Sequence, residues 1–410
     1  MSATVPREPP ALAAAALPHY AEGYGGSVLE LDRALGAVSG PADLIDLTHG
    51  DTRAFPPPPV AAADLLQAVE SGDEAYTAYR GSASLRARLA PRLAELLGRP
   101  VDPERELILT PGTQGGLFIA LSALLAPGDQ VALPDPDYFM SERIVAYLGA
   151  RARRLALDLS EDGRLRIDPD ELGAAAAARL LLLSHPNNPT GGVYDTATAE
   201  ALADWVLAGD RFAVADQLYC RQLFPGAGFV HLGALPGMSE RTVTLVGPSK
   251  TESMSGFRVG VAVGPAAAID AMERVLAMAS LRTTAHAQQA LRHWLDGDGE
   301  WIADRVCDHQ RIRDRLVGSL RAVPGLRVAS PLGSSYVFPD ASGTAWGRAR
   351  AGDRADALGI ALKQAGVLIN PGYQFGTGWP MSFRINFSQG PERLERAAER
   401  IAGVLASTDG

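Results

Sequence analysis

The fold of this chain is decided by the stretch Thr242-Val-Thr-Leu-Val-Gly-Pro-Ser-Lys-Thr-Glu-Ser-Met-Ser-Gly-Phe-Arg-Val-Gly260. An apolar, β-branched run leads into a polar bend that holds Ser249 and Lys250, and a second apolar run follows at residues 261–263. The two runs predict buried strands on either side of a loop. A lysine at the end of a buried strand can form an imine with an aldehyde, because a desolvated amine is more easily neutral and nucleophilic. The alternative is a surface lysine in a turn.

Short apolar strands alternate with helices around this stretch. We expect strands near residues 106–110, 130–133, 153–157, 180–184, 212–219, 242–246 and 259–263, with helices between most of them. This alternation predicts an α/β fold whose large domain has a mainly parallel sheet, covered by helices on both faces. In such sheets the functional site lies at the carboxyl ends of the strands, where the polar loops gather.

The character of the chain changes after residue 266. Long helices are expected at about 266–278 and 286–320, then short β-like runs, including 326–328, and a closing helix at 391–405. We therefore predict a large domain over residues 44–283 and a smaller α+β domain over 284–410. Residues 1–43 would be an N-terminal segment that packs with the small domain, and its first 18 or so residues would be a flexible arm.

Composition excludes several classes of function. The chain has 410 residues, of which 47% are hydrophobic, enough for two or three domains with sizeable cores. A net charge of −9 argues against general binding to nucleic acid or to anionic membranes. Two cysteines form no disulfide framework, and no metal-ligand spacing is present. No run is long and apolar enough for a signal peptide or a membrane span, so we expect a metal-free, cytoplasmic protein.

A glycine-rich turn at residues 111–116 separates an expected strand from an expected helix. Unpaired backbone N–H groups and the positive end of the helix dipole would point at the same place there. This turn is a candidate anion site.

Several motifs in one order carry a resemblance to a known family. They are Tyr76, Pro186-Asn-Asn-Pro-Thr-Gly191, Asp216 with Tyr219, Ser249-Lys250, Arg258 in Gly-x-Arg-x-Gly, and Arg384. Over about residues 40–400 the chain resembles the fold-type I pyridoxal-phosphate enzymes, in the class I/II aminotransferase branch. Each motif alone is weak evidence, and their joint order is specific.

The resemblance implies roles around a pyridoxal 5′-phosphate cofactor. Lys250 would form the internal aldimine and move protons at the substrate's α-carbon. Asp216 would keep the pyridinium nitrogen protonated, so that the ring accepts electrons. Tyr219 and Asn188 would hydrogen-bond the phenolate oxygen, and Tyr138 would stack on the ring.

The same resemblance places a phosphate site at the glycine-rich turn. Its groups would be Gly112, Thr113, Gln114, Arg258 and Ser249. The family usually has a hydroxyl residue three positions before the lysine, where this chain has Gly247. Tyr76 would reach the phosphate from the neighbouring subunit, which implies a homodimer with shared sites.

For the substrate, the resemblance makes Arg384 the clamp for the α-carboxylate of an amino acid. Gly50 matches a substrate-side glycine, and Tyr373 stands where many relatives carry a small residue. The loop around Gly50 departs from the family, because His49, Asp51 and Arg53 add charged or titratable groups. Either these groups line the pocket and alter substrate choice, or the loop is simply solvated.

Three functions are compatible with these residues. The first is an aminotransferase that moves an amino group from an L-amino acid to a 2-oxo acid. The second is a lyase, cyclase or related amino-acid-modifying enzyme of secondary metabolism, because the same residues serve elimination, replacement, cyclisation and oxidation. The third is a regulatory or binding protein that kept the fold, which the intact Lys250, Asp216 and Arg384 disfavour.

Overall fold

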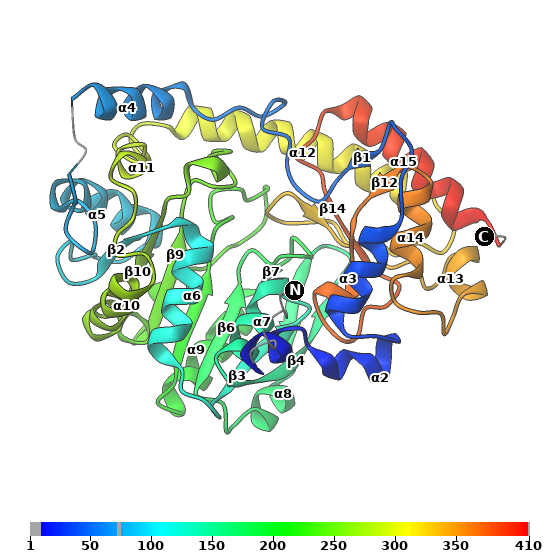
Figure 1. Ribbon diagram of the computed structural model, residues 1–410, viewed down its shortest axis with the longest axis horizontal. Coiled ribbons are helices and arrows are strands. Elements are labelled where there is room, and N and C mark those ends of the chain that lie inside the picture. The colour runs from blue at the N-terminus through cyan, green and yellow to red at the C-terminus, as the bar shows by residue number, and fades with distance from the viewer. Residues whose placement is uncertain (1–9, 72–74, 409–410) are drawn as a thin grey trace, which may run out of the picture.

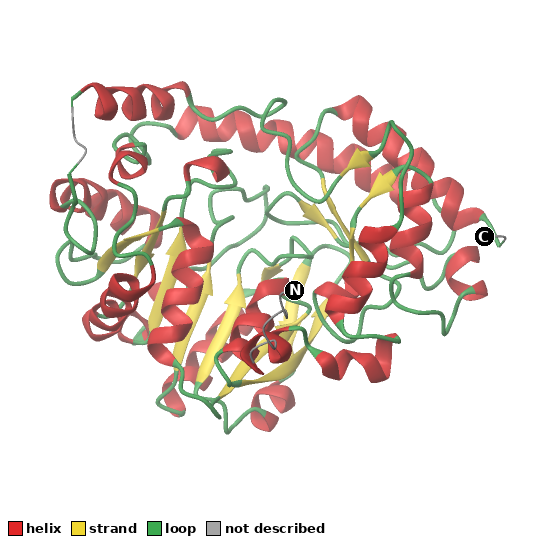
Figure 2. Ribbon diagram, in the orientation of Figure 1, coloured by secondary structure: helices red, strands yellow, loops and turns green. Residues whose placement is uncertain are grey.

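A nine-stranded sheet forms the centre of the computed structural model, which describes residues 10–71 and 75–408 (Figures 1 and 2). Its strands lie parallel except that β10 is antiparallel to both neighbours and β5 is antiparallel to β4. The predicted mainly parallel α/β sheet is confirmed. In order across the sheet the strands are β2 (Leu107–Thr110), β10 (Gly260–Val263), β9 (Thr242–Val246), β8 (Phe212–Asp216), β6 (Leu180–Ser184), β3 (Gln130–Asp135), β4 (Arg151–Leu159), β5 (Arg164–Ile167) and β7 (Val193–Tyr194).

Helices cover both faces of this sheet. One face packs against α6 (Gly112–Leu124), α7 (Phe139–Tyr147) and α10 (Ala266–Ala279). The other packs against α8 (Pro169–Ala174) and α9 (Thr196–Ala208), and α5 (Ala83–Leu97) covers the end near β2. Along β6, residues 180 and 182 enter the first core while 181 and 183 enter the second. A strand buried on both faces needs such a continuous apolar run.

A second layer is built mostly from the C-terminal third. It contains the three-stranded sheet β11 (Tyr336–Val337), β14 (Phe383–Asn386) and β13 (Asn370–Pro371). β1 (Ile45–Asp46) pairs in parallel with β12 (Val367–Leu368), and Leu47 and Phe55 join the same core. Residues 45–55 therefore pack with the C-terminal layer, although our domain prediction begins the large domain at residue 44. The surrounding helices are α13 (Ala345–Ala349), α14 (Ala357–Gln364) and α15 (Pro391–Ala406).

The N-terminal segment is more ordered than we predicted. From residue 10 onward it forms α1 (Pro10–Ala15), α2 (Ala21–Tyr24) and α3 (Val28–Ala37) rather than a free arm. A capping box between Ser27 and Glu30 starts α3. Leu17 is buried, because a small apolar cluster joins this segment to residues 355 and 373. Residues 1–9 of the predicted arm lie outside the described residues.

The predicted helix over residues 286–320 is two helices, α11 (Ala285–Gln289) and α12 (Gly299–Arg321). Between them Leu295 and Gly297 have positive φ angles of 62° and 65°, which a continuous α-helix does not allow. The run at 326–328 forms a single bridge from Arg327 to Asp340 instead of a strand. β5 and β7 were not predicted. In Figure 1, α12 runs along one side of the molecule from α4 (Pro59–Glu70) to the C-terminal layer.

The carboxyl ends of the central strands meet at one edge, as expected for parallel strands. Asp216 ends β8, the Pro186 turn follows β6, and Lys250 follows β9. Within the described ranges, no helix has the length and apolar character needed to cross a membrane.

Candidate active site

Two adjoining cavities meet at Lys250, and we call them the inner pocket and the outer chamber. The inner pocket has a volume of about 410 Å³ and the outer chamber about 350 Å³. Both are lined by Tyr219, Ser249, Lys250 and Ser255. The inner pocket also brings together most of the other predicted residues, namely Thr113, Gln114, Tyr138, Asn188, Asp216, Arg258 and Arg384.

Asp216 provides a buried carboxyl at the end of β8. Its Oδ1 accepts a hydrogen bond of 3.2 Å from the backbone N–H of Leu218. Burial raises the pKa of Asp216 to about 6, although that hydrogen bond and the charge of Lys250 lower it. The carboxyl is therefore mainly ionised at neutral pH, and it can hold a proton on a ring nitrogen placed against it.

Tyr219 forms a phenol pair with Tyr336, a pocket residue that our sequence reasoning missed. The Tyr219 hydroxyl donates to the Tyr336 hydroxyl at 2.7 Å. Burial raises the pKa of Tyr336, but Lys250, Arg384 and hydrogen bonds with Tyr219 and Asn386 outweigh it and hold this pKa at about 8. Burial raises the pKa of Tyr219 well above its ordinary value. Tyr336 is thus the more acidic member of the pair.

Arg384 is a buried cation on β14 whose bonds all go to neutral oxygens. Its Nη1 donates to Oδ1 of Asn188 at 2.7 Å, and its Nη2 donates to Oδ1 of Asn370 at 2.6 Å and to the carbonyl of Thr48 at 3.0 Å. Its Nε is buried without a partner, and no carboxylate pairs with it among the described residues. The guanidinium also lies 4.2 Å from the ring centre of Tyr336. A buried guanidinium whose partners are all neutral favours the binding of an anionic ligand.

The glycine-rich turn and Arg258 form one end of the inner pocket. Gly112 begins α6 with φ of 73°, and a Cβ there would lie 2.1 Å from Nη2 of Arg258. Glycine therefore lets the guanidinium approach the N-terminus of α6, where backbone N–H groups are free. Ser249 adds a buried Oγ that has no hydrogen-bond partner in the described part of the chain. Together these groups form an arrangement suited to a dianion.

The structure explains the glycine that departs from the family pattern. A Cβ at Gly247 would lie 3.2 Å from Cγ2 of Thr113 and 3.3 Å from Cα of Gly260. The position is therefore tightly packed, and Thr113 places its own side chain there. Thr113 and Arg258 both line the inner pocket, so a residue with a hydroxyl group is still present in its wall.

Tyr138 and Asn187 differ in what they do for the site. The Tyr138 hydroxyl donates to Oε1 of Gln114 at 2.9 Å, which fixes the ring in the wall of the inner pocket. Asn187 is occupied by the turn, because its Oδ1 accepts from the Thr190 hydroxyl at 2.7 Å and its Nδ2 donates to Asp137 at 3.2 Å. These bonds hold the turn in shape, so Asn187 has a structural role. Burial raises the pKa of Asp137 to about 8.

Three predicted site residues line neither cavity: Gly112, which borders Arg258 at the start of α6, and Tyr373 and Tyr76. Tyr373 is fully buried in the cluster around the N-terminal segment, and its hydroxyl donates to Asp32 at 3.1 Å. Our substrate-binding assignment for Tyr373 therefore needs correction, because its ring packs away from Lys250. Tyr76 is 79% exposed, and its ring lies 4.5 Å from the Arg282 guanidinium.

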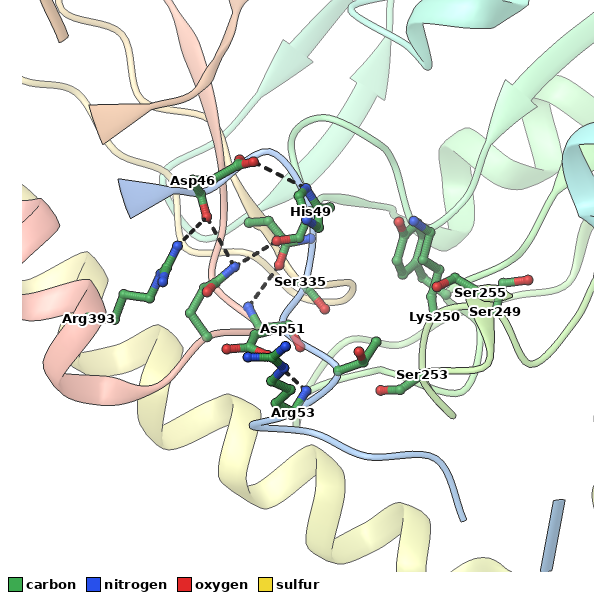
Figure 3. Close-up of a pocket in the computed structure, with 16 residues that line it drawn as sticks. Asp46, His49, Asp51, Arg53, Ser249, Lys250, Ser253, Ser255, Ser335 and Arg393 are labelled. Carbon is green, nitrogen blue, oxygen red and sulfur yellow. Dashed lines mark hydrogen bonds and ion pairs between the residues drawn. The ribbon is translucent and has the colours of Figure 1, made fainter. Parts of the chain in front are cut away.

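The outer chamber lies between the loop after β1, the Lys250 loop and the end of β14 (Figure 3). Gly50 lines it, and a Cβ there would come within 3.2 Å of Cβ of Ser388. His49, Asp51 and Arg53 line it as well. These three residues, which depart from the family's usual loop, therefore line the same cavity as Lys250.

Strand pairing could have revealed Tyr336. Tyr336 stands opposite Asn386 in the β11–β14 register, and Arg384 is two residues from Asn386 on the same strand. Because side chains alternate along a strand, Arg384 and Asn386 share a face, and their cross-strand neighbour lies beside them. A single sequence does not show which strands pair, so this signal was hidden. Thr48, Ser255 and Asn370 were missed for a similar reason, since each reaches the pocket from a loop or a short strand.

Comparison with known proteins decides the family. The model of aminotransferases of class I and II matches residues 42–401. The chain belongs to this family. Arginine–pyruvate transaminase AruH of Pseudomonas aeruginosa is 31% identical over 90% of this chain and 92% of its own length. Aspartate aminotransferase of Musicola paradisiaca is 31% identical over 84% of this chain and 85% of its own length.

Solved structures give the same result. The crystal structure of an aspartate aminotransferase from Rhodobacter sphaeroides is 38% identical, with a TM-score of 0.84 over 92% of this chain and 99% of that one. N-succinyldiaminopimelate aminotransferase of Mycobacterium tuberculosis has a TM-score of 0.83 at 25% identity, over 97% of this chain and all of the other. The chain is an enzyme, an aminotransferase of a family whose members depend on pyridoxal phosphate, as the first of the three functions predicted.

Proposed function

We propose that the aminotransferase binds pyridoxal 5′-phosphate in the inner pocket and transfers the amino group of an L-amino acid to a 2-oxo acid there. The observation that carries this proposal is the gathering of Lys250, Asp216, Arg258 and Arg384 around one cavity of about 410 Å³. The cavity fits the group because Gly112 leaves space for Arg258, and Ser249 offers an unpaired buried Oγ at the phosphate end. Thr113 and Gln114 complete that end.

The reacting groups then have distinct tasks. The Nζ of Lys250 would bond to the aldehyde carbon of the cofactor and later carry a proton to and from the substrate's α-carbon. The ionised carboxylate of Asp216 would hold the ring nitrogen protonated, and Tyr138 would support the face of the ring. Asn188 and Tyr219 would donate to the ring oxygen. The bound cofactor supplies an electron sink for the carbanion at the α-carbon.

Arg384 would orient the substrate. A guanidinium fork that already holds Asn188 and Asn370 is fixed in position, and it has no carboxylate partner in the described structure. The α-carboxylate of an amino acid supplies the missing anion with bidentate geometry. Fixing the carboxylate also fixes which bond of the α-carbon lies perpendicular to the cofactor ring.

The active enzyme would be a cytoplasmic homodimer with shared sites. Tyr76 contributes nothing to its own inner pocket, yet it is a largely exposed aromatic on a polar loop. We place its hydroxyl at the phosphate end of the partner subunit's pocket. Both cysteines, Cys220 and Cys307, are free, as a reducing compartment would keep them.

A spectroscopic half-reaction tests this function. The protein loaded with pyridoxal phosphate should show a visible absorption band, which an accepted L-amino acid removes and a 2-oxo acid restores. Lys250→Ala should not form the band. Release of ammonia with the original band regenerated, and no need for a 2-oxo acid, would contradict transamination.

A further inference from the structure

The outer chamber is polar on every side. Sixteen residues line it, and none of them is Ala, Val, Leu, Ile, Met, Phe or Trp; its aromatic rings are the phenol of Tyr219 and the imidazole of His49. Ligand pockets are usually lined mainly by apolar groups with a few polar ones. A cavity of about 350 Å³ with this lining is therefore unusual, and it opens directly on Lys250.

Much of this polar lining is already used to hold the walls together. The Gln389 side chain donates to the carbonyl of His49 at 2.7 Å, and the Ser388 carbonyl accepts from the backbone N–H of Asp51 at 2.8 Å. Ser335 accepts from Gln222 at 2.9 Å. The first two of these bonds hold the loop after β1 against the segment that follows β14 and so help to define the chamber's shape.

Other groups in the wall have no partner within the described residues. One oxygen of the Asp51 carboxylate caps the turn by accepting from the backbone N–H of Arg53 at 2.8 Å, while the other accepts no bond. Among the residues that the structure describes, the Arg53 guanidinium and the Thr52 hydroxyl take part in no side-chain hydrogen bond or ion pair. Figure 3 shows Asp51 and Arg53 on one loop across the cavity from Lys250. One carboxylate oxygen of Asp51 is thus available as an acceptor on the same loop as two available donors, the Thr52 hydroxyl and the Arg53 guanidinium.

We infer that this chamber is the subsite for the substrate's side chain, and that it selects amino acids whose side chain ends in a hydrogen-bonding group over aliphatic and aromatic ones. The inference rests on the proposed function. With the α-carboxylate on Arg384 in the inner pocket and the α-carbon beside Lys250, the chamber is the adjoining space that remains for the side chain.

The physical reason for the selection is desolvation. An apolar side chain entering the chamber would displace water from Asp51, Thr52 and Arg53 without replacing its hydrogen bonds, which disfavours binding of that side chain. A polar side chain replaces those bonds. Sites built to hydrogen-bond a substrate discriminate strongly against analogues that lack the group.

Matched amino acids test the inference on the cofactor-loaded enzyme. The rate of loss of the visible band would be measured for glutamine, glutamate and arginine, and for norleucine, leucine and phenylalanine. The fastest polar amino acid should exceed norleucine by at least about tenfold in rate constant per unit concentration. Norleucine, leucine or phenylalanine reacting as fast as the best polar substrate would overturn the inference. Failure of the proposed function looks different, because then either no visible band forms or the amino acid releases ammonia while the band is regenerated without a 2-oxo acid.

A paired variant locates the selection in the chamber. Thr52→Val combined with Arg53→Leu makes the exposed wall apolar without touching the inner pocket, so the visible band should keep its intensity. The ratio of polar to apolar rate constants should fall by about tenfold. Arg33→Leu, an exposed change on α3, is the control and should leave the ratio unaltered. A ratio that stays the same in the chamber variant would contradict the assignment.

Discussion

At the scale of single residues, the contact between Tyr336 and Tyr219 joins Arg384, the proposed clamp for the substrate carboxylate, to the proposed cofactor site. The ring of Tyr336 lies against the Arg384 guanidinium, and its hydroxyl accepts a hydrogen bond from Tyr219. One phenol therefore contacts both Arg384 and Tyr219. If the Tyr219 hydroxyl donates its hydrogen bond to the ring oxygen of a bound cofactor, it no longer donates to Tyr336. The Tyr336 hydroxyl can then donate to the oxygen of Tyr219 instead. The pair therefore has a donor available in either state.

Tyr336→Phe should abolish a phenol ionisation at about pH 8 in the protein without cofactor. The folded-state pKa lies below the ordinary value of 10, so this group adds stability as the pH rises through about 8, and the contribution is lost as the pH falls through that value. Tyrosinate absorbance against pH measures it. Tyr194→Phe is the control, because burial raises the pKa of Tyr194. Identical titration curves for Tyr336→Phe and the native protein would refute the assignment.

Arg384→Lys should raise KM for the amino acid and lower kcat/KM by at least about tenfold, because an ammonium cannot provide the planar two-point contact. Steady-state kinetics with one donor and one acceptor measures the effect, and the visible band should persist. An unchanged kcat/KM would show that the α-carboxylate binds elsewhere.

At the scale of elements, the Lys250 loop is braced by α12. Glu252 is fully buried and pairs with Arg221, which also donates to Asp298 at 2.6 Å where α12 begins. Trp294 donates to the same carboxylate at 2.9 Å. The loop that presents Lys250 is thus tied to the helix that runs toward the C-terminal layer.

Arg221→Leu should destabilise the protein by about 3–5 kcal/mol, because it leaves the Glu252 carboxylate buried without its cation. Adding Glu252→Gln to this variant removes the buried charge and should recover part of the loss. Urea unfolding of both variants measures the difference. Equal stability of the single variant and the native protein would mean that the pair contributes little.

Most of the predicted strands are apolar runs bounded by glycine, proline or polar residues, because both faces of the sheet are covered at the strands in its centre. The break between α11 and α12 was missed although the sequence carries a signal for it, because Asp296-Gly-Asp-Gly299 is typical of a turn and Leu295 and Gly297 have positive φ angles there. β7 is two residues long, and its pairing with β5 depends on a distant contact.

At the scale of the whole molecule, the sequence order of the motifs predicted most of the inner pocket, since Lys250, Asp216, Asn188 and Arg384 all follow or belong to recognisable strands. Tyr373 was misplaced because its neighbour is the N-terminal segment around Asp32, which no local pattern reveals. The domain boundaries stay predictions, and the pairing of β1 with β12 argues for grouping residues 45–55 with the C-terminal layer.

Tyr76→Phe should weaken retention of the cofactor in the assembled protein, since it removes a hydroxyl that we place in the partner subunit's site. Fluorescence titration of the protein with pyridoxal phosphate measures Kd, and sedimentation gives the oligomeric state. Tyr79→Phe, on the same loop, is the matched control. A monomeric protein with native affinity in both variants would rule out a shared site.

The central claim is that Lys250 is the residue that bonds the cofactor, and borohydride reduction followed by peptide mapping tests it most directly. Reduction should remove the visible band and leave the pyridoxyl mass on the peptide that contains Lys250 and on no other. Label on a different lysine, or a reduced protein that carries no label, would contradict the account.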